Sequence, residues 1–256
     1  MASSFQSFAV PAIPLIAPND DLVSLIVEGL NGLGREFLSG DILVLAQKVV
    51  SKAEGRTIDL NQVTPSPRAL EIASECEKDP REVELILSES TEILRIAPNL
   101  VIAAHRTGVI LANAGLDRSN VESGDGEENV LLLPADPDQS CRTIRDRLRE
   151  ETGTDVAVII SDSLGRPWRL GTTGVAIGAA GLPALLDLRG DTDLFGRELK
   201  ISQQAIADEL AAAAALLQGQ GADGQPAVVI RGDFSWGQPE TGAAALVRPE
   251  EMDLFR

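Results

Sequence analysis

Residues 155–178 constrain the fold of this chain more than any other stretch. The apolar run 156–160 predicts a buried strand, which ends at Ser161-Asp162-Ser163. A carboxylate and two hydroxyls at the end of a buried strand are hard oxygen ligands on a rigid support, as a divalent cation beside phosphates requires. Arg166 and Arg169, just downstream, can bind anionic oxygens bidentately. The same residues also fit a plain polar turn in which Asp162 caps backbone amides, so this stretch alone leaves both interpretations open.

Charge and composition narrow the possible partners. The formal net charge is −17, which disfavours non-specific binding to nucleic acid or to a membrane surface. Aromatic residues are only 3% of the chain, so platforms that stack bases are not expected. An anionic substrate would have to be held by local Lys and Arg clusters, by backbone amides or by metal cations. The few clustered basic residues are therefore informative.

The chain of 256 residues is long enough for one large domain or two small ones. No linker stands out, so we expect a single unit over residues 1–256, with no subdomain boundary that can be assigned. The N-terminus lacks the pattern of a signal peptide, and no run reaches the roughly 18 apolar residues of a membrane span. We therefore expect a cytoplasmic protein. Cys76 and Cys141 lie in helical patterns and are interpreted as ordinary thiols.

Apolar spacing and turn signals predict helices and strands in mixed order. Helices are expected over residues 20–33, 67–77, 80–92, 138–151 (with Asp138 as the cap) and 202–217. Strands are expected over 42–46, 100–104, 109–112, 130–133, 156–162, 175–179 and 227–231. Residues 5–16 are expected to be extended, and Gly219 is expected to end the last helix.

A basic segment follows the strand at 42–46. Gln47 and Lys48 come first, and Lys52 and Arg56 follow in a chain short of cations. Lysine is a natural point-charge binder for polyphosphate. A solvated basic turn fits the composition equally well.

Two further loops are rich in polar atoms or glycine. Asp117 and Asn120, in the loop 113–120, can aim at one point as a metal ligand and a hydrogen-bonding neighbour, although a local Asx turn is favoured without context. The loop 218–225 can cradle a phosphate with backbone amides, but it lacks a Walker A ending, and alone it fits a helix cap and turn better.

His105 is interpreted as a structural residue or one on the substrate side of the site, not as a catalytic base. Together these loops predict a nucleotide-and-metal site, and they leave open whether phosphate is transferred or only bound.

The same stretches, in the same order, closely resemble the coenzyme F420-0:L-glutamate ligase family. The matching blocks are IPLI (13–16), GDILVLAQKVVSKAEGR (40–56), NAGLDRSNV (113–121), LLLPADPD (131–138), VIISDSLGRPWRLGTTGVAIGAAG (158–181), DLFGRELK (193–200) and QGQGADGQPAVVIRG (218–232). They cover nearly the whole chain, and seven collinear blocks are far more specific than any one of them.

The resemblance implies an α+β fold of mixed sheets with flanking helices, in an intertwined homodimer. It implies GTP as co-substrate, two divalent ions (Mg or Mn), K as a monovalent cation, and L-glutamate and a deazaflavin acceptor as partners, with no nucleic acid and no membrane. By position, the GTP contacts would be Ile13, Pro14, Leu15, Ile16, Gln47, Lys48, Lys52, Asn120, Gln218, Gly219, Gln220, Gly221, Ala222, Asp223, Gly224 and Gln225. The metal ligands would be Asp117, Asp162, Ser163 and Gln220, and Asp117, Asp162 and Lys52 would carry the catalysis.

The chain departs from the family pattern in three places. Gln220 stands where relatives are expected to carry a glutamate metal ligand, so the site holds one charge fewer. Ser163 stands where threonine is common. No flavin-reductase-like domain, as some bacterial relatives carry, is expected after this unit.

The implied reaction is GTP-dependent addition of L-glutamate to coenzyme F420-0, and then of a γ-linked second glutamate, through an acyl phosphate. Two alternatives stay open. One is the same ligation on another carboxylate acceptor, such as a folate- or pterin-like molecule. The other is a non-catalytic GTP-binding regulatory protein.

Overall fold

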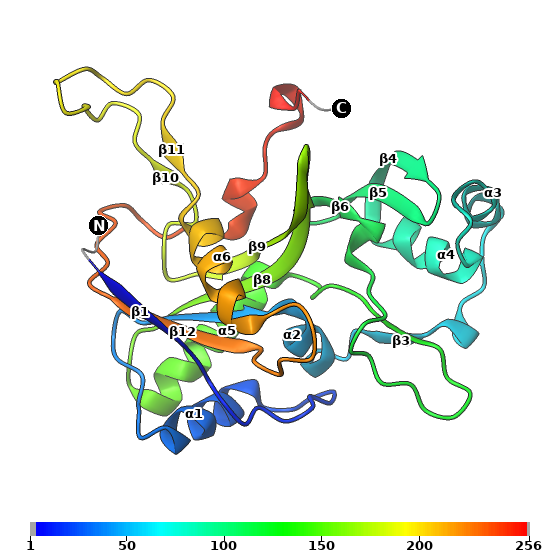
Figure 1. Cartoon of the computed structure of the whole chain (residues 1–256), viewed down its shortest axis with the longest axis horizontal. Helices are drawn as coiled ribbons and strands as arrows, with labels where there is room; N and C mark the ends of the chain where they lie inside the picture. Colours follow the sequence, from blue (N-terminus) through cyan, green and yellow to red (C-terminus); the bar gives the residue numbers. More distant parts are fainter. Residues whose placement is uncertain (1–3, 255–256) are drawn as a thin grey trace.

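A five-stranded mixed sheet forms the centre of the computed structural model, which describes residues 4–254 (Figure 1). Its strands, in spatial order, are β1 (Phe5–Ala9), β12 (Ala227–Gly232), β2 (Ile42–Ala46), β8 (Ala157–Arg166) and β9 (Arg169–Ala180). β2 and β8 run parallel, and the other neighbours are antiparallel. In the parallel pair Ala46 lies opposite Ser161, so the chain that leaves β2 starts beside the polar part of β8.

Helices cover both faces of this sheet. Along β2, Leu43 and Leu45 point to one face and Ile42 and Val44 to the other, and all four are buried. The face of Leu43 packs against α1 (Leu22–Gly32) and α5 (Pro137–Thr152). The opposite face packs against the alanine-rich α6 (Ile206–Gln218). A strand buried on both sides must be apolar at every position, which explains the unbroken apolar runs of β2, β12 and the start of β8.

Residues 57–131 form a lobe beside the sheet, drawn from cyan to green in Figure 1. The lobe has a three-stranded sheet in the order β4–β5–β6 and its own apolar core under two helices. Its elements are β3 (Thr57–Asp59), η1 (Leu60–Gln62), α3 (Pro67–Cys76), α4 (Pro80–Ser88), β4 (Ser90–Ala97), β5 (Leu100–His105), β6 (Ile110–Ala112), η2 (Asn113–Gly115) and β7 (Asn129–Leu131). β3 pairs with β7, which brings the two ends of the lobe together.

The remaining elements lie at the edges. α2 (Gln47–Ala53) follows β2 directly, and η3 (Ala243–Leu246) and η4 (Glu250–Met252) lie near the C-terminus. β10 (Leu186–Asp187) and β11 (Gln203–Gln204) pair at the base of an arm, residues 186–204, which projects away from the body (Figure 1). No helix within residues 4–254 is long and apolar enough to cross a membrane.

The α+β class and its mixed sheets confirm the sequence-based prediction of the fold. The strands expected over 100–104 and 109–112 are β5 and β6, which pair antiparallel, and Gly219 caps α6 as predicted. Cys76 and Cys141 are buried free thiols on helices, as expected. His105 is fully buried and bonded to Thr107, which confirms the structural interpretation.

Several expected element boundaries and one expected helix cap were wrong. β8 does not end at Asp162 but continues to Arg166, because it pairs with β9 as a long hairpin. The predicted helix 80–92 stops at Ser88, and β4 begins at Ser90 and pairs with β5. Residues 47–53, for which a solvated basic turn was one of two open interpretations, form the helix α2. The cap of α5 is Asp136, whose side chain accepts from the Gln139 amide.

Asp138, expected as that cap, has another role. Its carboxylate accepts the amides of Ala179 in β9 and Ala243 in η3, each at 2.8 Å. It therefore ties the C-terminal segment to the central sheet. The predicted helix over 202–217 also begins later, at Ile206, because Gln203 and Gln204 pair in β11.

A buried ion network joins the lobe to the end of α2. The Glu89 carboxylate accepts from Arg56 at 2.7 Å and from Arg106 at 3.0 Å, and His105 Nε2 lies 3.4 Å away. Arg56 also donates to the carbonyl of Leu133 at 2.9 Å. Burial alone would raise the pKa of Glu89, but the contacts with His105, Arg56 and Arg106 outweigh it and lower the pKa from 4.5 to about 2.

We expect Glu89→Gln to destabilise the protein by on the order of 2 kcal/mol at pH 7, because two arginines lose their charged partner. The folded-state pKa of Glu89 lies below its unfolded value, so its contribution is complete above pH 4.5 and is lost as the pH falls towards 2. Urea unfolding at pH 7, 5 and 3 measures this, with Glu75→Gln on the exposed face of α3 as the control. A stability difference that does not shrink with falling pH contradicts the assignment.

Candidate functional site

A cavity of about 1590 Å³ is walled by both the central sheet and the lobe. From the sheet side come α2, β8 and the loop 218–226. From the lobe come β5, β6 and residues 113–122, and the N-terminal segment 13–18 closes another side. The predicted site residues lie in these walls, and the local backbone structure of each wall determines where their side chains lie.

α2 places two cations over the cavity. Lys48 and Lys52 are four residues apart, so they lie on one face of the helix. Lys48 Nζ lies 2.8 Å from an oxygen of Asp117 and also donates to Ser119, and Lys52 Nζ donates to the carbonyl of Asn120 at 2.6 Å. Burial, and then the charge of Lys48, lower the pKa of Lys52. The nearby loop 113–121 is therefore held to α2 by its own polar groups.

A turn with unusual backbone angles presents Asp117. Asn113, Ala114 and Gly115 all have positive φ, and Asn113 Oδ1 fixes the turn by accepting the amide of Val101 at 3.1 Å. Only glycine fits at position 115, because a Cβ there would lie 2.6 Å from the side chain of Leu133. Strained backbone of this kind is found where a site demands a fixed position.

Asp117 is held at both its backbone and its side chain. Its amide and carbonyl both pair with Leu131, at 3.0 and 2.8 Å. One carboxylate oxygen accepts the Ser119 amide at 2.6 Å, which is the expected Asx turn, and the other faces Lys48. Burial would raise the pKa of Asp117, but the bonds from Lys48 and Ser119 outweigh it, and the pKa lies below its ordinary value.

Asp162 is a second carboxylate in the same cavity. It lies on β8, is partly buried, and accepts the amide of Ser163 at 2.8 Å. Burial raises its pKa, and the negative charge of Asp117 raises it further. Two carboxylates that repel each other in one cavity are a place where a cation would be stabilised.

The glycine-rich loop, residues 218–225, brings Gln220 next to Ser163. Both residues are among the metal ligands that the family resemblance implies. Gln220 Nε2 donates to the Ser163 hydroxyl at 2.8 Å, and its Oε1 accepts from Thr172 at 3.1 Å. Asn120 Nδ2 approaches the carbonyl of Gly221 at 3.5 Å, so this loop also reaches the lobe.

The structure brings nearly all of the predicted site residues to one cavity. The residues that line it are Ile13 to Ile16, Gln47, Lys48 and Lys52 on α2, Asp117, Asn120, Asp162, Ser163, and the loop 218–225 without Asp223. Asp223 instead accepts the amide of Gly221 at 3.2 Å and shapes the loop from within. Arg166 lines the cavity and Arg169 does not.

Sequence reasoning missed several residues that hold these groups in place. Ser119 contacts Lys48, Thr172 contacts Gln220, and Glu122 lies near Lys52. Ser119 and Glu122 belong to, or directly follow, a loop that the sequence had already singled out. Thr172 is 48 positions from Gln220, and no local pattern indicates that pair.

The candidate ligands suit a divalent metal ion that a substrate also coordinates. The candidate ligands Asp117, Asp162, Ser163 and Gln220 all offer oxygen, which Mg²⁺ and Mn²⁺ prefer. Across residues 4–254, no group of three or more His, Cys, Asp or Glu side chains is close enough to hold a metal by itself. Magnesium commonly binds through one or two carboxylates together with substrate phosphates. The residues present therefore suit a metal that arrives with a phosphate-bearing ligand.

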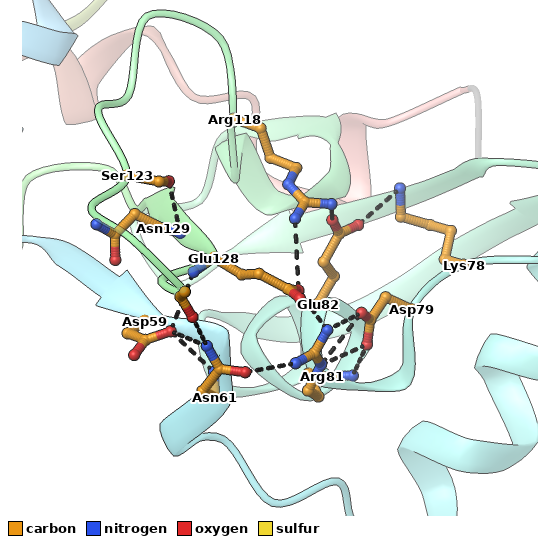
Figure 2. Close-up of polar contacts among 11 residues, drawn as sticks. Asp59, Asn61, Lys78, Asp79, Arg81, Glu82, Arg118, Ser123, Glu128 and Asn129 are labelled. Atoms are coloured by element: carbon orange, nitrogen blue, oxygen red, sulfur yellow. Dashed lines mark hydrogen bonds and ion pairs between the residues drawn. The ribbon is translucent and has the colours of Figure 1, made fainter.

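A polar network behind the Asp117 turn anchors that turn to α4 (Figure 2). Arg118 donates to the buried carboxylate of Glu82 at 3.0 Å, and Lys78 contacts the same carboxylate at 3.3 Å. Arg81, on α4, forms ion pairs with Asp79 and with Glu128, which directly precedes β7. The chain that enters β7 is therefore also held to α4.

We expect Arg118→Met to loosen the Asp117 turn while the lobe stays folded, because Glu82 keeps Lys78 as a partner. Hydrogen exchange of residues 113–121 should become faster, and any activity that needs Asp117 should fall on the order of tenfold. The control is Arg147→Met, which removes exposed ion pairs on α5. Unchanged exchange in 113–121 would show that the network does not position the turn.

The chain is similar to known proteins over nearly its whole length. Residues 12–232 match the family described as F420-0:Gamma-glutamyl ligase. A protein of Methanothermobacter thermautotrophicus named Coenzyme F420:L-glutamate ligase is 48% identical over 249 residues, 96% of this chain and 97% of the relative. Proteins with the same name from Methanopyrus kandleri and Archaeoglobus fulgidus are 47% and 44% identical, over 96% and 98% of this chain and 96% of each relative.

These comparisons define the class of this protein as an enzyme, a ligase. The chain belongs to the F420-0:gamma-glutamyl ligase family.

Proposed function

We propose that this enzyme uses GTP to join L-glutamate to coenzyme F420-0, and then adds a second glutamate through the γ-carboxylate. The family match and the names of the relatives support the ligation and its acceptor. One observation of the structure carries the proposal: Asp117, Asp162, Lys52 and a glycine-rich loop converge on one cavity. That combination offers anionic metal ligands, a cation and backbone amides to a triphosphate.

The nucleotide is proposed to lie along α2 and the loop 218–225, with the segment 13–16 beside it. Lys48 and Lys52 are the cations of this wall, and Lys52 has no carboxylate partner among the ion pairs of residues 4–254. Asn120 reaches the loop from the lobe. A triphosphate placed here would meet positive charge on one side and amide donors on the other.

Two divalent ions, Mg or Mn, are proposed to be held by Asp117, Asp162 and Ser163, with Gln220 supplying a carbonyl oxygen. Bound there, they would supply charge neutralisation for the triphosphate. Burial raises the pKa of Asp162, and the negative charge of Asp117 raises it further, which supports the placement. A monovalent cation, K, belongs to the same proposal, without assigned ligands.

The reaction joins two carboxyl-bearing molecules by way of phosphate. A carboxylate oxygen of the acceptor forms a bond to the γ-phosphorus of GTP, and GDP leaves with the electron pair of the broken bond. The amine of L-glutamate then attacks the acyl carbon, phosphate leaves, and the amine loses a proton as the amide forms. The first step brings two anions together, and Lys52 is placed to offset that repulsion.

The test of this function is product analysis by mass spectrometry. The protein is incubated with GTP, Mn or Mg, L-glutamate and F420-0. We expect F420-0 to gain glutamate residues, with one GDP and one phosphate released per bond. GTP turnover that does not depend on acceptor and glutamate, or no turnover at all, favours the regulatory alternative. Products only with a folate- or pterin-like carboxylate favour the other acceptor class.

Metal binding can be tested apart from activity. We expect Asp162→Asn to weaken Mn binding in the presence of GTP strongly, because it removes the charge of one proposed metal ligand. Gln220→Glu should strengthen it by about 1–2 kcal/mol, because it adds a charge beside Ser163. Titration calorimetry with Mn measures both, and Gln225→Glu in the same loop is the control. If Gln220→Glu and Gln225→Glu behave alike, Gln220 is not a ligand.

A homodimer is also proposed, and the projecting arm supports it. Leu194, Phe195 and Ile201 on the arm are 99%, 85% and 87% exposed, which is unusual for large apolar side chains. A second copy of the chain would cover them. Sedimentation equilibrium should give twice the 27.1 kDa of one chain, and Leu194→Ser with Phe195→Ser should give the monomer. A monomeric parent protein contradicts the proposal.

A further inference from the structure

The cavity is larger than one ligand needs. Its volume is about 1590 Å³, whereas a pocket for one drug-sized ligand measures roughly 300–1000 Å³. The residues assigned above to GTP and metal lie on α2, the loop 218–225, the Asp117 turn and the start of β8. They leave the wall formed by β5 and β6 without a role.

That wall is the uncovered face of a small sheet. Leu100 and Ile102 lie two residues apart on β5, so their side chains share a face of the sheet. Ile110 pairs with Ala104, which is two residues beyond Ile102, so Ile110 lies on the same face. The opposite face, with Val101 and Ala103, is fully buried against α3 and α4. Val101 and Ala103 therefore pack into the lobe core, whereas Leu100, Ile102 and Ile110 on the other face line the cavity.

The cavity-facing side of this sheet is apolar. Leu100 is 36% and Ile110 is 40% exposed, and Ala112 lies between them and the Asp117 turn. None of the residues of β5 and β6 that line the cavity is charged. Branched aliphatic side chains on a pleated surface suit a planar ring system, and they cannot bind a triphosphate.

Arg166 supplies a cation beside this face. It lies on β8 four residues beyond Asp162, about 13 Å further along an extended strand. β6 packs against β8, and Leu164, between Asp162 and Arg166, packs into the core cluster that contains Leu111. The Arg166 guanidinium contacts the carbonyl of Gly171 at 3.5 Å and forms no ion pair within residues 4–254. In a chain with a net charge of −17, a cation that lines a cavity without a carboxylate partner is available to an anionic ligand.

We propose that the β5–β6 face and Arg166 form the acceptor subsite. The planar ring of the deazaflavin lies on Leu100, Ile102 and Ile110, and Arg166 binds the phosphate of its arm. The arm then runs along β8 towards Asp162, where its carboxylate meets the nucleotide. This inference rests on the proposed function for the identity of the acceptor, and it extends that function by locating the ring and the phosphate.

The test separates ring from phosphate with two fluorescent probes, F420-0 and 5-deazariboflavin, which has the ring and no phosphate. Ile110→Gln should weaken both probes by about tenfold, because the ring loses an apolar contact. Arg166→Ala should weaken F420-0 by on the order of tenfold and leave 5-deazariboflavin unchanged. GTP affinity should be unchanged in both variants. Leu70→Gln on α3 and Arg95→Ala on β4 are matched exposed controls outside the cavity.

The outcomes distinguish this inference from the proposed function. If the parent protein glutamylates F420-0 but neither variant changes probe affinity, the subsite is wrong and the function stands. If the variants weaken GTP instead, the guanine base occupies this face and the subsite is again wrong. If the probes respond as expected but the parent protein makes no product, the subsite stands and the proposed reaction fails.

Discussion

The parallel pairing of β2 and β8 is the constraint on which the site depends. Because Ala46 lies opposite Ser161, the two strands reach the same edge of the sheet at the same level. β2 then turns directly into α2, which carries Lys48 and Lys52, while β8 continues into Asp162. In open α/β sheets, ligands bind beyond the carboxyl ends of the strands. Here that geometry places cations and a carboxylate side by side before any loop contributes.

The lobe contributes a charged group, the carboxylate of Asp117, to the site. The Asp117 turn reaches α2 by the ion pair with Lys48 and is held from behind by Arg118 and Glu82. The same ion pair lowers the pKa of Asp117, while burial and the charge of Asp117 raise the pKa of Asp162. The cavity is lined by three carboxylates, Asp117, Glu122 and Asp162, and by three cations, Lys48, Lys52 and Arg166, so it offers both metal ligands and cations to the proposed metal-bound triphosphate. The second lobe surface, β5 with β6, carries no charge into the cavity and suits a different part of the reaction.

Much of this arrangement follows from the sequence, and the physical reasons for the exceptions are specific. β2 and the start of β8 were predictable because strands buried on both faces are apolar without interruption. α2 was not, since its seven residues follow Ala46, which offers no side-chain cap. The extension of β8 was missed because its partner β9 pairs with polar residues that resemble a turn, and β4 was missed because two irregularities interrupt its pairing with β5. Contacts such as Arg118 with Glu82, 36 positions apart, depend on tertiary structure alone.

The central claim is that Asp117 and Asp162, brought together from the lobe and the sheet, hold metal against a nucleotide triphosphate. Crystals grown with Mn and a non-hydrolysable GTP analogue test it most directly. The account predicts anomalous scattering peaks between these two carboxylates and the triphosphate, beside Ser163. A triphosphate bound elsewhere, or manganese with no contact to either carboxylate, would contradict it.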